Sequence, residues 1–301
     1  MNSPVRNERG LALLSALLSV ALLTLIVVEM TDTAFVHTQL TRNAGNALAA
    51  QLLARSGQIG ASAVLEEARD NEQIQRFVDA LVDAPPLTLP TARGHTMQIR
   101  VRDEMGRLNL NEAQEYDEAF QNLFAELDLD PGLLEALQAR IDGANAGLRN
   151  VGEDCNLAVA CDPPLGPLRS FDDLQTIRGF DPQTMARIRP FVTVHQSRKN
   201  RGAINLRTAR AEVLRAIGCE DTEALPPPPR ASEDIQGWLE SGPCGGAKPR
   251  PRDMRSQVYS ILSAAQVGDA TQAVEATIEV GKGPIAWKQR PVWGVGPGEV
   301  L

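Results

Sequence analysis

Aromatic residues and positive charge are both in short supply in this 301-residue sequence, and each shortage narrows the possible functions. Aromatic residues make up only 4% of the chain, too few for the rows of stacking surfaces on which single-stranded nucleic acids bind. The net charge is −8, so the chain as a whole has no electrostatic attraction for phosphate backbones. Both features disfavour nucleic acid as a partner.

Catalytic motifs are also lacking. The three histidines, His37, His95 and His195, stand far apart in the sequence. No Gly-x-Ser-x-Gly nucleophile motif, His-Glu-x-x-His zinc motif or phosphate-binding glycine loop occurs. The sequence therefore predicts a protein that is not an enzyme and requires no cofactor.

Charged residues and proline are absent from residues 11–28, which form a continuous apolar run. As an α-helix, these residues span about 27 Å, close to the thickness of the hydrocarbon core of a bilayer. Arg6 and Arg9 precede the run, and positive charge keeps such a head on the cytoplasmic side. The sequence predicts a single-pass inner-membrane protein with a cytoplasmic N-terminus and its bulk in the periplasm.

Gly10 stands directly before the apolar run. A secretory signal peptide has a shorter apolar region followed by a small-residue cleavage site, and no Ala-x-Ala follows Val28. The arrangement resembles the type IV prepilin leader, which a dedicated peptidase cuts after the glycine, so the cut is expected between Gly10 and Leu11. The fifth mature residue is then Ser15, where major pilins have glutamate. A plain membrane anchor with an incidental glycine is the alternative.

The four cysteines all follow the apolar run. Their Cys-x5-Cys and Cys-x24-Cys spacings lack the close pairs typical of structural zinc modules, and an oxidising periplasm favours disulfides. Four cysteines allow three pairings, and the sequence leaves the choice open. The most local solution pairs Cys155 with Cys161 and Cys219 with Cys244.

Beyond the membrane, apolar residues at helical spacing predict that one helix continues to about residue 70, with Gly57 and Gly60 as candidates for a bend. Residues 96–103 alternate apolar and polar side chains, which predicts a strand with a basic face outward. Further strands are expected over residues 257–262 and 273–280, with a weaker one over residues 285–289.

Two phrases share the pattern Gly-x-Leu/Ile-Asn-Leu-x-x-Ala, at residues 106–113 and 202–209. Each precedes a helical segment, and asparagine and threonine are favoured at helix starts. We expect two small helical units that begin with the same turn, with two unrelated turns as the alternative. The strand near residue 100 can pair with strands after residue 257 only if both units are an insertion.

These motifs in this order resemble type II secretion system protein K, a minor pseudopilin, from residue 10 to about residue 285. The resemblance implies an α+β fold: a pilin-like long N-terminal helix plus a small antiparallel sheet, with a large inserted helical region of two SAM-like units. The phrases that carry the resemblance are residues 9–14, 101–111, 170–174 and 203–209.

The same resemblance divides the chain into seven parts. They are a prepilin-type leader (1–10), the transmembrane part of the helix (11–28), the periplasmic helix with the first strand of the pilin-like core (29–105), a first SAM-like domain (106–200), a second SAM-like domain (201–256), the C-terminal strands of the core (257–290) and a flexible tail (291–301).

As function, the resemblance implies a non-catalytic subunit at the tip of a periplasmic pseudopilus. Such a subunit helps to initiate pseudopilus assembly for export of folded proteins from the periplasm across the outer membrane. Its partners are the I-type and J-type minor pseudopilins, the major pseudopilin and the prepilin peptidase. Ser15 suits a tip position, because a tip subunit has no neighbour above it whose amino terminus a glutamate would meet.

The resemblance also implies a calcium site in the inserted helical region. Calcium takes several oxygen ligands, and the matching stretch offers Asp142, Glu153 and Asp154. The alternative is a solvated acidic loop without a metal.

Two other functions stay open at this point. The paired short helices also resemble DNA-binding helix-hairpin-helix modules, and a minor pilin of a surface type IV pilus has the same kind of leader. The second helical unit carries a local basic cluster of Arg198, Lys199, Arg201, Arg207 and Arg210.

Overall fold

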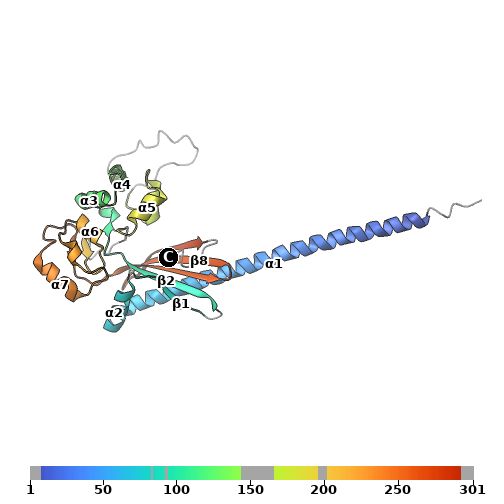
Figure 1. Cartoon of the computed structure of the whole chain (residues 1–301), viewed down its shortest axis with the longest axis horizontal. Helices are drawn as coiled ribbons and strands as arrows, with labels where there is room; N and C mark the ends of the chain where they lie inside the picture. Colours follow the sequence, from blue (N-terminus) through green and yellow to red (C-terminus); the bar gives the residue numbers. More distant parts are fainter. Residues whose placement is uncertain (1–7, 83, 92–93, 144–165, 196–201, 293–301) are drawn as a thin grey trace, which may run out of the picture.

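The fold is built on one helix, α1 (Glu8–Ala68), which runs without interruption for 61 residues. We describe it from a computed structural model that covers residues 8–82, 84–91, 94–143, 166–195 and 202–292. At 1.5 Å per residue the helix is about 90 Å long. Its first half projects alone from the rest of the molecule, and its second half lies along a sheet (Figure 1). Neither Gly57 nor Gly60 ends the helix.

The sheet has five strands in the order β1-β2-β7-β8-β9, and every neighbouring pair is antiparallel. The predicted α+β fold, with a long N-terminal helix and a small antiparallel sheet, is therefore confirmed. The strands are β1 (Leu87–Pro90), β2 (Thr96–Asp103), β7 (Val258–Val267), β8 (Ala270–Glu279) and β9 (Gly283–Val292).

Strand β1 does not follow from the sequence pattern. It holds four residues, ends in Pro90 and comes directly after Pro85 and Pro86. Proline lacks the N–H group that an inner strand needs, so it is confined to edge strands and strand ends. Strand β1 occupies such an edge, where it pairs only with β2.

Small side chains allow α1 to lie close against one face of the sheet. Ala50 and Ala54 are fully buried there. A Cβ atom added at Gly57 would stand 2.5 Å from Ser263 Oγ and closer still to Met97 Sδ. The glycine at this position therefore serves helix-to-sheet contact.

Farther along α1, the contact with the sheet widens into an apolar core. Leu65 and Ala68 pack with Val101, Tyr259, Ile261 and Ile278. Helix α2 (Glu72–Leu81) adds Val78 to the same core, and its N-terminus is capped by Asn71.

Everything between β2 and β7 is an insertion of two helical units, both lying beyond the end of the sheet that is far from the apolar part of α1 (Figure 1). A single apolar cluster runs through both units. The first holds β3 (Leu108–Asn109), η2 (Leu110–Glu112), α3 (Asp117–Glu126), α4 (Gly132–Asp142), η3 (Phe171–Thr176), α5 (Pro182–Ile188) and β4 (Val192–Thr193). The second holds β5 (Ala203–Asn205), α6 (Ala211–Ala216), η5 (Thr222–Ala224), α7 (Ser232–Ser241) and β6 (Arg250–Arg252).

The two repeated phrases form the same turn. Asn109 accepts a hydrogen bond from the N–H of Asn111 at 3.1 Å, and Asn205 accepts one from the N–H of Arg207 at 3.1 Å. Each phrase also supplies a short strand that pairs in parallel with a strand at the end of its own unit, β3 with β4 and β5 with β6. The shared sequence pattern is thus a shared way of closing each unit.

A buried polar contact joins the second unit to the sheet. Asp103, the last residue of β2, is 1% exposed. Its carboxylate accepts hydrogen bonds from the N–H of Met105 at 2.8 Å, from Asn205 Nδ2 at 2.7 Å and from the hydroxyl of Thr208. Asn205 Nδ2 also donates to Ser256 Oγ, 2.8 Å away. Burial raises the pKa of Asp103, and the donors around the carboxylate act in the opposite direction.

Replacing Gly57 by valine tests the close contact between α1 and the sheet. We expect G57V to lower the free energy of unfolding by about 1–3 kcal/mol, the usual cost of overpacking. The matched control is G60V, because nothing lies within 4 Å of the position of its Cβ atom. Urea unfolding of the full chain in detergent micelles measures both variants, and equal stability of G57V and G60V would contradict the proposed contact.

Candidate functional site

The apolar N-terminal part of α1 has no contact with the folded body. An 18-residue window of this helix reaches a mean hydropathy of 2.8 and is 0% buried. Leu11 is 67% exposed and Leu18 is 68% exposed. Such a helix is long and apolar enough to cross a bilayer, and it fits a single-pass membrane anchor.

The predicted processing residues lie near the start of α1. Gly10 and Leu11 are both helical, and Ser15 follows one turn later. The Ser15 hydroxyl donates a hydrogen bond to the backbone carbonyl of Ala12 at 2.9 Å. Because this bond satisfies the hydroxyl within its own helix, the serine is compatible with an apolar surrounding. A glutamate carboxylate at this position could not donate a hydrogen bond to a carbonyl of its own helix in this way.

The aqueous part of α1 carries a second apolar face that points away from the sheet. Its members, which we call the outer stripe, are Leu48, Leu52 and Ile59, and each is 56–57% exposed. Their spacing of four and seven residues places them on one side of the helix. A stripe of this kind is suited to packing against another helix.

The three predicted calcium ligands are not all within the described residues. Asp142 is the last residue of α4 and is half-exposed. Glu153 and Asp154 lie outside the described residues. Among the residues that are described, no group of three or more His, Cys, Asp or Glu side chains is placed to hold a metal ion. The calcium site stays a prediction.

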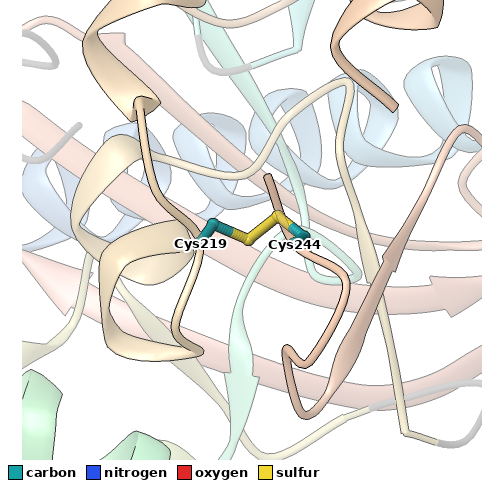
Figure 2. The surroundings of a disulfide bond; sticks show 2 residues. All are labelled: Cys219 and Cys244. Atoms are coloured by element: carbon teal, nitrogen blue, oxygen red, sulfur yellow. A yellow bond between two sulfur atoms is a disulfide. The ribbon is translucent and has the colours of Figure 1, made fainter. Parts of the chain in front are cut away.

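Cys219 and Cys244 form a disulfide, with their Cα atoms 4.3 Å apart (Figure 2). The bond links the residue after the turn that ends α6 to the loop that follows α7. Two backbone hydrogen bonds flank it, from Glu220 N–H to the carbonyl of Pro243 and from Lys248 N–H to the carbonyl of Ile217. The same pairing is the local one that the sequence left open.

The other two cysteines, Cys155 and Cys161, lie outside the described residues, as do residues 293–301 of the predicted tail. Strand β9 continues to Val292, so the expected boundary at residue 290 falls inside a strand.

Two residues of the basic cluster of the second unit, Arg207 and Arg210, make contacts within the chain. The guanidinium of Arg207 lies 2.7 Å from Asp253 and 3.7 Å from Asp79. Arg210 stacks over the ring of Phe191 at 5.9 Å. An arginine that already pairs with two carboxylates is poorly placed to bind a phosphate backbone. Arg198, Lys199 and Arg201 lie outside the described residues.

The sequence predicts that the basic face of β2 points outward. Arg102 does lie on the face of the sheet opposite α1, but there it is half-buried and lines a cavity between the sheet and the first helical unit. The residues that roof this cavity come from positions 169–172 and 189–195, more than 60 residues from β2 in the sequence. No local pattern in the sequence could reveal that arrangement.

A long N-terminal helix packed along an antiparallel sheet is a pilin-like fold, and the comparisons with known proteins agree. Residues 106–197 match the family model for the first domain of type II secretion system protein K. The fold is similar to a chain in the crystal structure of the GspK-GspI-GspJ complex from the type 2 secretion system of enterotoxigenic Escherichia coli. The TM-score is 0.62 at 15% identity, over 85% of this chain and 100% of that chain. Among curated proteins, none matches the sequence.

The particular protein that this chain resembles is therefore type II secretion system protein K, as the sequence motifs predicted. The match over residues 106–197 covers the first helical unit, and the likeness of fold extends to the helix and the sheet. Together they support the role of a minor pseudopilin.

Removing the disulfide tests its contribution to the second unit. Closing a loop of 25 residues stabilises a fold by about 3 kcal/mol. We expect the double variant C219S/C244S to lose about that much free energy of unfolding, measured by urea titration without reductant. The control is the same comparison with reductant present, where neither chain holds the Cys219–Cys244 bond and the difference in stability should shrink. An unchanged stability of C219S/C244S would show that this bond contributes nothing.

Proposed function

We propose that this chain is the non-catalytic tip subunit of a type II secretion pseudopilus. It is inserted with its N-terminus in the cytoplasm and its bulk in the periplasm, and the prepilin peptidase cuts it between Gly10 and Leu11. In this role it helps to begin the pseudopilus that exports folded proteins from the periplasm across the outer membrane.

The observation that carries the proposal is the combination of one continuous helix with two different apolar faces. The inner face of α1 is buried against the sheet, while the outer stripe of Leu48, Leu52 and Ile59 is exposed. A subunit of a helical fibre needs this arrangement, because its helix must hold its own body and meet a neighbouring helix at once. The family match over residues 106–197 favours a secretion pseudopilus over a surface type IV pilus.

The partners follow from the same likeness. The similar solved chain is part of a complex of GspK, GspI and GspJ. By analogy, this chain assembles with I-type and J-type minor pseudopilins, and through them with the major pseudopilin. The outer stripe supplies an apolar helix face for such contacts, and nucleic acid is not a partner in this proposal.

Two finer features belong to the proposal as well. The first is Ser15. A glutamate at this position would pair with the amino terminus of a neighbouring subunit, so a serine suits a subunit that has no neighbour above it. Calcium binding by Asp142, Glu153 and Asp154 is the second feature, and its chemistry would be that of a structural cation with oxygen ligands.

Processing is tested by mass spectrometry of the mature N-terminus. We expect the chain purified from membranes to begin at Leu11, and G10L to remain uncut, because the peptidase requires the glycine before the cut. The control is G45A, a glycine replacement in the same helix with nothing within 4 Å of its Cβ position. An intact Met1 in the unaltered chain, or a cut after Val28, would contradict the prepilin route.

The tip position is tested by immunogold labelling of pseudopili made in cells that also overproduce the major pseudopilin. We expect an epitope tag on this chain to label one end of each fibre, and deletion of the chain to reduce the number of fibres. The same tag on the major pseudopilin serves as control and labels the whole length. Label from this chain along the sides of the fibres would contradict a tip subunit.

A further inference from the structure

A positively charged cavity lies between the sheet and the first helical unit. Its volume is about 340 Å³, at the small end of the roughly 300–1,000 Å³ typical of ligand pockets. The floor comes from the face of the sheet opposite α1, with Arg102, Ser260 and Glu275, and the roof comes from the first helical unit. The cavity therefore exists only where the two parts of the fold meet.

The charges that line the cavity do not balance. Three ion pairs use up its carboxylates: Arg107 with Glu104, Arg189 with Glu275, and Lys288 with Asp172. Two arginines that line the same cavity, Arg102 and Arg169, have no ion pair or side-chain hydrogen bond with any residue that the structure describes. Two positive charges are thus left over, in a protein whose net charge is −8.

The pKa of Arg102 reflects both its burial and the repulsion from neighbouring arginines. Burial, followed by the charges of Arg107, Arg189 and Arg100, lowers the pKa of Arg102 to about 10. The remaining titratable group, His195, does not add to the positive charge at neutral pH, because burial lowers its pKa. A half-buried guanidinium among like charges costs free energy unless an anion accompanies it.

We propose that this cavity binds a small oxyanion with two or more negative charges, such as phosphate or sulfate, between Arg102 of β2 and Arg169 of the first helical unit. Guanidinium groups are well suited to this chemistry, because their fixed fork of N–H donors matches oxyanion geometry. The anion contacts both the sheet and the helical unit, so binding fastens the unit to the pilin-like core.

The cavity is large enough for such an anion. A volume of about 340 Å³ corresponds to roughly ten water molecules, which admits an inorganic oxyanion or a short dicarboxylate. Ser260 and Thr277 also line the cavity, and their hydroxyl groups hydrogen-bond each other at 3.3 Å.

The test uses the full chain in nonionic detergent, with inorganic phosphate as probe against sodium chloride at equal ionic strength. We expect a saturable rise in the unfolding temperature with phosphate, since a ligand of the folded state stabilises it by mass action. R102Q is expected to weaken phosphate binding about tenfold or more, the loss of one charge-assisted hydrogen bond. R169Q, at an exposed residue, is expected to weaken it as well.

The control is R76Q, which makes the same charge change on the exposed face of α2 and is expected to leave the phosphate effect unchanged. In chloride alone, R102Q should be at least as stable as the unaltered chain, because it removes repulsion. The proposal is overturned by an unfolding temperature that does not respond to phosphate, by an equal response of R102Q and R76Q, or by a loss of stability of R102Q in chloride. The last result would show that Arg102 is only a structural cation.

Discussion

The buried hydrogen bond that Asn205 donates to Asp103 holds the architecture of this chain together. Asp103 ends the second strand of the sheet, and Asn205 begins the second helical unit about a hundred residues later. Asn205 also reaches Ser256, just before the chain re-enters the sheet. One side chain thus ties the departure of the insertion to its return. A carboxylate buried in this way is costly unless donors surround it, and three donors do so.

Because the inserted units are held at the end of β2, helix α1 can pack against the sheet on one side and meet a neighbouring molecule on the other. The inserted units lie beyond the end of the sheet that is far from the apolar part of α1, so the helix packs mainly against the sheet and α2 (Figure 1). Its inner face is fixed by alanines and Gly57, which hold the sheet at close range, and its outer stripe remains available to a neighbour. The apolar N-terminal part adds a third environment, the bilayer, without any change in secondary structure.

Much of this fold follows from local sequence signals. The apolar run of residues 11–28, the alternation in residues 96–103 and the repeated Gly-x-Leu/Ile-Asn-Leu phrase all predict elements that the structure contains. The sequence did not predict strand β1 or the two-residue strand β4. A strand of two to four residues is defined by its partner and not by its own pattern. The role of Gly57 in packing could not be predicted either, because its neighbours Met97 and Ser263 come from two strands that are distant in the sequence.

Only part of the candidate site can be predicted from the sequence. Gly10 and Leu11 are predicted from a purely local pattern, a glycine directly before the apolar run, and the cut between them stays a prediction. The pairing of Cys219 with Cys244 was one of several possible pairings, and only the fold chooses it. The surroundings of Arg102 do not follow from the sequence, because strand alternation tells which face a side chain is on and not what covers that face.

The unbroken course of α1 has a mechanical consequence. With no hinge between the membrane and the sheet, the folded body is set rigidly in both height and angle above the bilayer. Each residue of an α-helix advances the chain by about 1.5 Å and turns it by about 100°. Inserting a single residue between 28 and 48 would raise the body only slightly but rotate the outer stripe by more than a quarter turn relative to the anchor. The number of residues in this segment therefore determines the direction, around the helix axis, in which the outer stripe faces a neighbouring subunit.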